Sequence, residues 1–559
     1  MWSARSTSFL VGCDCCETQV RTRATLRPGG RRVPGVSARL SCGLNPNGGR
    51  KQEPKEATQG NTIPDGCRNL RPSDRGGCQE WNLNVLFYNN AFGTAMNTKT
   101  YRTGLVWFRT GLRLHDNTCL FAALQENEQV YALYVLDDTY LRGADIGAAR
   151  VAFLFDALHK LQADIESYGG QLIVRRVKQA PQQEVVAVAK EVGARAIYLN
   201  RDYLPYPIQR DRHAKALAEA EGIAFKTYPD ILLVEPERVK TETGLPYQVF
   251  TPFKRRWENL VNVPERYSIE PLLGRLRVTH HVRSAEIPSL AEYGLSLRQQ
   301  IEPAGERRAL QRLEAFARNG LPVYHQRRDF AADPDSTSRL SMHIKWGTIS
   351  IRECYRTARK VGGPGAQKWI DELAWREFYH AVLYYFPHAL TGPMHPEYDR
   401  LPWSENEEHF QAWKAGMTGY PFVDAGMRQL NQTGWMHNRL RQVVASYLCK
   451  DLLIHWQKGE RYFMQMLVDG DWPANNGGWQ WVAGTGTDPR RATRIFNPVL
   501  QQERYDSQME YIRQWVPEFG SAQYPQKPIV PHEEGRQRFL NAFKAMIGPT
   551  QSSTIGELF

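Results

Sequence analysis

The pattern of hydrophobic and polar positions divides the chain into regions of different kinds. Residues 1–95 show no persistent helical or strand period and are dominated by Gly, Pro, Arg and Ser, which is typical of disorder. We therefore expect a disordered extension over residues 1–101. From residue 102 short apolar runs alternate with helical stretches, and from about residue 300 helical periods dominate.

Residues 102–230 predict an α/β domain. Short apolar runs with the length of buried strands occupy residues 105–108, 130–136, 172–177 and 196–199. Between the second and third runs, apolar residues from Val151 to Leu161 follow helical spacing until Gly169 and Gly170 end the helix. This alternation predicts a parallel, Rossmann-like sheet with helices on both faces. Since no GxGxxG follows the first strand, a nicotinamide site is not expected.

The remaining regions predict a linker, an all-α domain and a tail. Residues 231–299 are rich in Pro, Gly and charge and predict a long surface connection between domains. Residues 300–545 predict helices, and residues 546–559 a tail. In the helix after Trp435, one apolar stripe is formed by Leu440, Val443, Val444, Tyr447 and Leu448. Asn438 and Gln442 share another face of that helix.

Net charge gives only weak support for a nucleic-acid partner. The chain of 559 residues carries a formal charge of +12, but residues 1–95 alone hold 13 Lys/Arg against 7 Asp/Glu. The other half of the excess is spread over the rest of the chain, whereas binding needs a local patch. No run of 18 apolar residues occurs, so no membrane segment is expected.

The extension has two interpretations. Residues 1–50 contain eight arginines and only two acidic residues, Asp14 and Glu17, which is the composition of an organellar transit peptide. Met96 stands just before the first predicted strand, so residues 1–95 equally suit an upstream translation artefact or a tail. The expected compartment depends on this choice. We expect the cytoplasm if the extension is an artefact, and a plastid, a mitochondrion or the nucleus if it is a real targeting segment.

Cysteine usage favours a reducing compartment and no metal site. Six of the nine cysteines precede residue 96, and the other three, Cys119, Cys354 and Cys449, are scattered. Scattered cysteines do not make a disulfide framework. Cys13, Cys15 and Cys16 lie close together, but no second half with zinc-ligand spacing follows, so no metal is predicted.

The most unusual segment is DGDWPANNGGWQWVAGTGTD, residues 469–488. It combines carboxylates, paired asparagines, paired glycines and tryptophans, a mixture that an ordinary core does not need. Gly477 and Gly478 permit a close approach of the backbone, and Trp479 and Trp481 point to different neighbours in either a helix or a strand. Nine of the 15 tryptophans fall between Trp369 and Trp481. Aromatic density alone is more often core than function.

These motifs resemble a known family. The run WMHNRLR at residues 435–441, the segment at 469–488 and RIFNP at residues 494–498 are similar to the flavin domain of the photolyase/cryptochrome family. Within it, the resemblance is to class I cyclobutane pyrimidine dimer photolyases of bacteria, over residues 102–545. It implies an α/β antenna domain, an FAD domain and an enzyme, a carbon–carbon lyase that repairs pyrimidine dimers in DNA. Electron transfer from excited, reduced FAD to a flipped-out lesion would split the dimer.

The resemblance implies roles for individual residues on the cofactor side. Three tryptophans match its electron-transfer chain: Trp403, Trp456 and Trp479. Asn475 matches the asparagine that faces flavin N5 and suits a repair enzyme. The positions that match flavin contacts are Tyr324, Thr337, Ser338, Arg339, Leu340, Ser341, Trp369, Arg376, Arg441, Asp469, Gly470 and Asp471. We expect Arg441 to pair with Asp469 near the flavin ring.

On the substrate side, the resemblance implies a lesion pocket and a DNA contact surface. Glu372 and Trp375 are three residues apart and share a helix face. Trp375 and Trp481 match rings that cover the flipped pyrimidines, while Glu372 and Asn438 match groups that bond to their edges. Arg328, Arg439 and Gln501 match contacts to the DNA backbone.

Several positions depart from the family pattern. Gln442 stands where these enzymes usually carry Met, as in DASH-type relatives that act on single strands, whereas Trp481 argues against that type. Leu204 replaces the Glu of folate-binding members, so a folate antenna is not expected; a deazaflavin, another pigment or an empty site stays open. The alternatives to repair are a cryptochrome-type photoreceptor, including the DASH type, a 6-4 photoproduct photolyase, and a light-independent flavoprotein or passive DNA-binding module. We expect a monomer.

Overall fold

The computed structural model describes residues 100–487 and 494–547, and the predicted extension up to residue 99 lies outside them. The first described element is a strand, and five parallel strands form one sheet in the order β3-β2-β1-β4-β5. The strands are β1 Tyr101–Phe108, β2 Asn127–Asp137, β3 Leu172–Val177, β4 Ala196–Asn200 and β5 Ala224–Tyr228. The α/β fold with a parallel sheet is therefore confirmed.

Four of these strands coincide with the predicted apolar runs, and β5 was missed. Its sequence AFKTY is half-buried at the sheet edge and contains a lysine and a threonine, so it forms no apolar run. The edge position explains this composition, because an edge strand buries less of its surface than a central one. The predicted helix after β2 is α4, Ala148–Ser167, and it ends just before Gly169 as expected.

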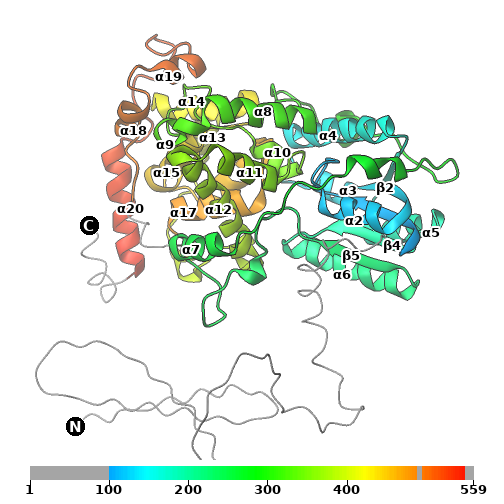
Figure 1. Ribbon diagram of the computed structural model, residues 1–559. Coiled ribbons are helices and arrows are strands. Elements are labelled where there is room, and N and C mark those ends of the chain that lie inside the picture. Colours follow the sequence, from blue (N-terminus) through cyan, green and yellow to red (C-terminus); the bar gives the residue numbers. More distant parts are fainter. Residues whose placement is uncertain (1–99, 488–493, 548–559) are drawn as a thin grey trace, which may run out of the picture. The chain divides into compact units, whose positions relative to one another are not determined.

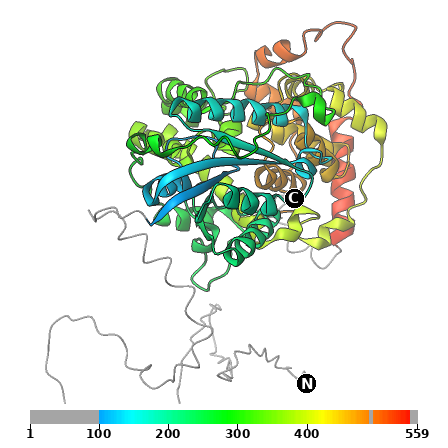
Figure 2. The same ribbon diagram turned by 90° about the vertical axis from the view of Figure 1, so that its right-hand side faces the viewer.

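Helices cover both faces of the sheet (Figures 1 and 2). Alternate strand residues separate the two cores: Val106 and Phe108 pack with α2 and α4, whereas Leu105 and Trp107 pack with α5 and α6. The covering helices are α2 Thr118–Glu126, α4, α5 Pro181–Glu191 and α6 Pro205–Ala220; the short α3, Asp138–Leu141, follows β2. Strands buried on both faces explain the near-continuous apolar runs in the sequence.

The rest of the described chain is helical (Figure 1). The α-helices are α7 Phe250–Leu260, α8 Glu306–Asn319, α9 Tyr324–Arg327, α10 Ser341–Trp346, α11 Ile351–Val361, α12 Gly363–Tyr385, α13 Glu407–Ala415, α14 Pro421–Thr433, α15 Asn438–Ser446, α16 Trp456–Met466, α17 Trp472–Ala483, α18 Pro498–Tyr505, α19 Glu510–Trp515 and α20 His532–Ile547. The 3₁₀ turns are η2 Pro236–Arg238, η3 Glu270–Arg275, η4 Leu290–Tyr293, η5 Leu321–Val323, η6 Pro387–Leu390 and η7 Pro396–Arg400. None of the described helices is long and apolar enough to cross a membrane.

The predicted helix after Trp435 is not one regular helix. It is α-helical to Ser446 and continues as a π-helical turn, η8 Tyr447–Asp451. Helix α20 docks on this turn, where Asp451 Oδ1 lies 2.5 Å from His532 Nδ1. The apolar stripe predicted the buried face correctly, but periodicity alone does not distinguish a π turn from an α turn.

The expectation that residues 231–299 form a surface connection was partly wrong. This segment contains α7, and both Phe253 and Trp257 on it are buried. Glu377 of α12 holds the segment in place, since its carboxylate accepts bonds from Trp257 Nε1 at 2.6 Å and from Val234 N at 3.0 Å. The proline and charged residues of this segment suggested a surface loop, although it contains an amphipathic helix with two buried aromatic side chains.

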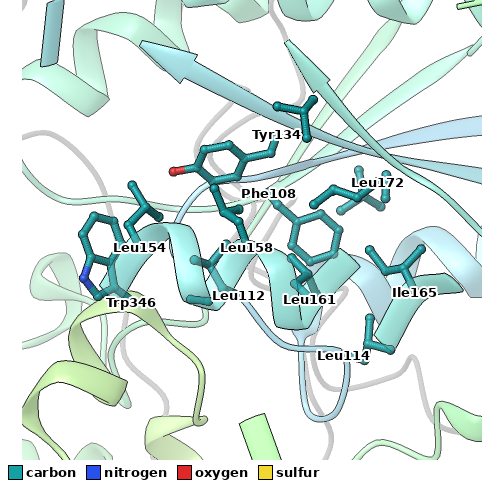
Figure 3. Close-up of a cluster of buried hydrophobic side chains, with 14 of the residues drawn as sticks. Phe108, Leu112, Leu114, Tyr134, Leu154, Leu158, Leu161, Ile165, Leu172 and Trp346 are labelled. Atoms are coloured by element: carbon teal, nitrogen blue, oxygen red, sulfur yellow. The ribbon is translucent and has the colours of Figure 1, made fainter. Parts of the chain in front are cut away.

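The sheet and the helical part share a core and a charge cluster. Trp346 of α10 packs with Leu154 and Leu158 of α4 in one apolar cluster (Figure 3). Beside it lies what we call the joint cluster, formed by Arg113, Asp116, Asp230, Arg352 and Arg356. Asp230 is fully buried, and burial raises its pKa, but Arg113 and Arg352 outweigh that effect and hold the pKa at about 2.

Candidate functional site

One cavity of about 460 Å³ in the helical part gathers most of the predicted site residues. Its lining residues come mainly from α12, α15 and α17, with α9 and the segment before α10 completing its wall. The predicted residues that line it are Tyr324, Arg328, Thr337, Ser338, Arg339, Leu340, Ser341, Trp369, Glu372, Trp375, Arg376, Asn438, Arg441, Gln442, Asp469, Asp471, Asn475, Trp479 and Trp481. Residues from six separate segments thus meet in a space suited to a small-molecule ligand.

Five predicted residues do not line this cavity. Gly470 is buried, and its carbonyl accepts a bond from Arg150 Nη1 at 3.0 Å. Arg439 pairs with Asp329 at 2.9 Å and lies over the Tyr505 ring, while Gln501 is on α18. Trp456 and Trp403 belong to the apolar cluster that also contains Trp479. The structure therefore separates the cavity wall from a neighbouring outer surface and from a row of tryptophans.

Asp469 lines the cavity and has one carboxylate oxygen without a hydrogen-bond partner among the described residues. Its Oδ2 accepts a bond from Arg441 Nη2 at 2.8 Å, which confirms the predicted ion pair. Its Oδ1 is buried and has no hydrogen-bond partner among the described residues. A buried acceptor without a partner is unfavourable. An N–H donor on a bound ring would complete its bonding, and this is where the cavity fits a flavin.

Asp471, the other acidic residue of this segment, is fully engaged. It accepts a bond from Lys345 Nζ at 2.7 Å, and His380 Nε2 lies 3.4 Å from its other oxygen. Burial raises the pKa of Asp471, but Lys345 and His380 outweigh burial and hold that pKa well below its usual range. The resulting charged pair fixes the start of α17 against α10 and α12.

An amide network behind Asn475 ties α17 to α16. Asn475 Nδ2 donates to the backbone carbonyl of Glu460 at 3.1 Å. Asn476 Nδ2 donates to Glu460 Oε1 at 2.9 Å, and Gln480 Nε2 donates to Asn476 Oδ1 at 3.0 Å. Burial raises the pKa of Glu460 to about 7. The network orients the Asn475 side chain at the cavity wall.

Glu460 was not predicted from the sequence, although its position in α16 falls on the buried face of the helix. The buried positions of α16 are Trp456, Gly459, Glu460, Phe463 and Met464, which follow helical spacing. A lone carboxylate on such an apolar face is rarely buried without a partner. That exception could have pointed to the amide network before the fold was known.

The two adjacent glycines of α17 have different neighbours. A Cβ on Gly477 would lie 2.1 Å from Tyr379 Cδ1, so this glycine allows α17 to pack closely on α12. Gly478 lines the cavity, and a Cβ there would meet no atom within 4 Å. The predicted close approach of the backbone therefore occurs at Gly477, against the Tyr379 ring, whereas Gly478 leaves space at the cavity wall.

An aromatic and polar mouth forms on α12 and α15. Trp375 is stacked on Phe250 of α7, with ring centroids 3.6 Å apart and an interplanar angle of 8°. Phe250 was not singled out from the sequence, because its partner lies more than a hundred residues away. Glu372 forms an ion pair with Arg328. The helix-face predictions for Glu372 with Trp375 and for Asn438 with Gln442 agree with this placement.

The three predicted electron-transfer tryptophans belong to one apolar cluster. Trp479 lines the cavity and is buried, Trp456 is also buried, and Trp403 is half-buried at the cluster edge. A Cβ on Gly459 would lie 2.2 Å from Trp479 Cη2, so α16 approaches the Trp479 ring closely. Trp479 thus lies at the cavity, and Trp403 is the partly exposed member of the row.

No group of three metal-ligating side chains occurs in the described part of the chain, and the Cys13–Cys16 segment lies outside it. The three described cysteines are buried and free. The cavity therefore carries aromatic, amide and charged groups, which suit a flat organic cofactor rather than a metal centre.

Comparison with known proteins identifies the family. Residues 104–271 match the model of DNA photolyase, and residues 369–539 match the FAD binding domain of DNA photolyase. The chain is 37% identical to a deoxyribodipyrimidine photo-lyase of Synechococcus sp., over 80% of this chain and 98% of the relative.

Similar solved structures support the same family. A bacterial class III photolyase from Agrobacterium tumefaciens is 33% identical and has a TM-score of 0.74, covering 81% of this chain and 100% of the other. A cryptochrome from Synechocystis sp. is 28% identical with a TM-score of 0.71, covering 80% and 100%. From this identity and coverage, the chain belongs to the DNA photolyase family.

Proposed function

We propose that this protein is a light-dependent lyase that splits cyclobutane pyrimidine dimers in DNA with the help of bound FAD. One observation carries this function: a single cavity joins the residues predicted to hold a flavin with those predicted to hold a flipped lesion. The relatives named photo-lyase support the same activity.

The chain's own residues would hold FAD at the inner wall of the cavity. Asp469 supplies the open acceptor described above, and Asn475 supplies an amide oriented by the network around Glu460. Hydroxyls of the segment at residues 337–341 suit the ribityl chain and the phosphates. FAD, when bound, supplies light absorption and one-electron chemistry.

The mouth residues would hold the lesion. Trp375, backed by Phe250, offers one face to a pyrimidine, and Trp481 offers a second ring. Glu372 accepts hydrogen bonds from base N–H groups, while Asn438 and Gln442 both donate and accept. Arg328 at the cavity wall and Arg439 and Gln501 outside it would contact the DNA backbone and position the strand.

The tryptophan row would supply the electron that activates the cofactor. Trp479 at the cavity wall, Trp456 behind it and Trp403 at the edge of the cluster form a sequence from inside to outside. Indole is the most readily oxidised of the apolar side chains, so such a row suits one-electron transfer. No metal ligand, nucleophile or hydrolytic water is needed for this chemistry.

A direct repair assay tests the function. Purified protein, reduced beforehand with dithionite, is mixed with a duplex oligonucleotide that carries one thymine dimer and is illuminated with blue light. Restored thymines are quantified by chromatography against a dark control. We expect light-dependent repair, and a loss of about 100-fold in Glu372→Ala because a lesion-side acceptor is removed. Asp371→Ala on the same helix is the matched control, since Asp371 pairs with Lys254 instead.

A photoreceptor is the second candidate, favoured by the likeness to the Synechocystis cryptochrome. It predicts bound FAD and photoreduction but no repair of either duplex or single-stranded substrate. Repair restricted to single strands would instead assign a DASH-type specificity, consistent with Gln442. Absence of light-dependent repair from both substrates, with FAD bound, would contradict the lyase function.

The finer details are proposals of the same kind. The protein acts as a monomer in the cytoplasm if residues 1–95 are an artefact, or in an organelle or the nucleus if they form a targeting segment. Size-exclusion chromatography with light scattering tests the first statement. Fluorescent fusions of the chain with and without residues 1–95 test the second.

A further inference from the structure

A histidine side chain contacts two of the proposed electron-transfer tryptophans. The His455 ring centroid is 5.1 Å from that of Trp403 and 5.9 Å from that of Trp456. It is roughly stacked on Trp456, with an interplanar angle of 24°, and meets Trp403 edge-on at 63°. The outer step of the row therefore has an ionisable ring in contact with both its donor and its acceptor.

His455 also caps the helix that carries Trp456. Its Nδ1 accepts a hydrogen bond from the backbone N–H of Gln457 at 3.2 Å, and α16 begins at Trp456. An acceptor at this position stabilises the helix start. Because Nδ1 accepts, the neutral ring carries its proton on Nε2. Protonation of Nδ1 would remove this capping bond and add a positive charge.

The charged groups around His455 define its environment. Asp399 of η7 lies 4.0 Å from Nε2, and Glu405, which pairs with Lys458 at 2.5 Å, is the other acidic residue that acts on it. Burial lowers the pKa of His455, and Lys458 lowers it further, against the two acidic residues that raise it. A lowered pKa keeps the imidazole neutral at pH 7, and the ring gains its charge only below the ordinary pKa of histidine.

The indole Nε1 of Trp403 is buried and has no hydrogen-bond acceptor in the part of the chain that the structure describes. At the moment of electron transfer, loss of one electron turns this indole into a cation. A second positive charge at about 5 Å disfavours that cation, since the two repel strongly at this separation.

We propose that His455 is a positioning residue of the outer electron-transfer step and makes that step dependent on pH. The inference rests on the proposed function, specifically on the tryptophan row. One electron moves from Trp403 to oxidised Trp456, so Trp403 is oxidised and Trp456 is reduced, with no bond made and no proton moved. Before that step, Trp479 gives one electron to the light-excited flavin and regains one from Trp456, which leaves Trp456 oxidised. An added thiol finally returns one electron to Trp403. Neutral His455 permits the outer step, and charged His455 opposes it.

Flash photolysis of the FAD-loaded protein tests the inference. The yield of long-lived oxidised tryptophan is measured from about pH 8 down to about pH 4.5, normalised to bound flavin. In the wild type we expect a fall of about tenfold, because the added charge lies next to Trp403. Its midpoint should coincide with the His455 pKa measured by NMR on the same protein.

Two variants separate charge from packing. His455→Asn keeps a capping acceptor without a charge, and His455→Phe keeps a ring without a charge; both should hold the yield within about twofold over this pH range. His395→Asn, which changes another half-buried histidine of the same region, should behave as the wild type. An equal acid-dependent fall in both His455 variants would overturn the inference.

Failure of the proposed function is distinguishable from failure of this inference. Chemically reduced protein needs no tryptophan row, so its repair should be the same in the wild type and in both His455 variants. If reduced wild type does not repair dimers, the proposed function fails. The pH dependence of tryptophan oxidation still decides the role of His455.

Discussion

Two buried carboxylates show how a structural charge differs from a site charge. In the joint cluster, Asp230 is bonded to Arg113 and Arg352 at 2.8 Å each and to Thr118 Oγ1 at 3.1 Å. In the cavity, Asp469 is bonded to Arg441 through one oxygen, and its other oxygen has no partner among the described residues. A satisfied charge holds protein to protein, whereas a charge with an open position awaits a ligand.

The largest expected effect is on the joint cluster. Asp230→Ala leaves two buried guanidinium groups without their carboxylate, so the free energy of unfolding should fall by about 3–5 kcal/mol. Urea denaturation measures this loss. Glu221→Ala, which removes only an exposed pair with Lys190, is the control and should change it by less than about 1 kcal/mol. A small effect of Asp230→Ala would mean that the cluster is not structural.

A pH effect of similar size is expected at the amide network. Burial raises the pKa of Glu460 to about 7, so its contribution to stability is fully present below pH 4.5 and is lost as the pH rises through 7. The loss amounts to roughly 3 kcal/mol at most. Urea midpoints measured between these pH values should fall in the wild type and fall less in Glu460→Gln. An unchanged slope in the variant would show that Glu460 ionises normally.

The paired glycines offer a finer test of the same contrast. Gly477→Ala should lower the free energy of unfolding by about 1–3 kcal/mol, because the new methyl group meets the Tyr379 ring. Gly478→Ala should leave the unfolding of the cofactor-free protein nearly unchanged and weaken FAD binding, since its methyl group enters the cavity. Both quantities are measured on both variants. If both variants changed the free energy of unfolding and FAD binding equally, Gly477 could not be assigned to helix packing and Gly478 to the cavity.

The smallest expected change concerns Asp469 itself. Asp469→Ala should raise the Kd for FAD by roughly tenfold, which corresponds to about 1.4 kcal/mol for a lost acceptor. Titration of cofactor-free protein with FAD, followed by flavin fluorescence, measures it. Asp329→Ala removes the partner of Arg439 outside the cavity and serves as control. If FAD affinity were unchanged in Asp469→Ala, Asp469 would belong with Asp230 as a structural charge.

The sequence predicted the elements whose environment is uniform. The three inner strands are largely buried, and β3 at one edge begins with three buried apolar residues, so the pattern of these four was sufficient. By contrast, β5 at the other edge mixes polar and apolar residues and was missed. The anchor at Trp257 was missed for a related reason: its partner, Glu377, lies more than a hundred residues later. The local pattern of hydrophobic and polar residues does not indicate a contact between residues so far apart in the sequence.

The residues of the site also divide into those that the sequence predicted and those that it did not. Motif resemblance selected most of the cavity wall, because those residues lie in continuous segments that can be matched one by one. It did not select Phe250, Glu460 or His455, which act through a neighbour's side chain. Their importance depends on packing between elements, and only the fold brings those partners together.

The joint cluster has a consequence for engineering by domain exchange. A chimera that replaced the sheet domain, for example to alter the colour of light collected, would import a new residue opposite Arg352 and Arg356. Without carboxylates equivalent to Asp116 and Asp230, those two arginines of α11 would have no acidic partner on the other side of the seam. Successful grafts should therefore transplant the charge pattern of the seam together with the domain.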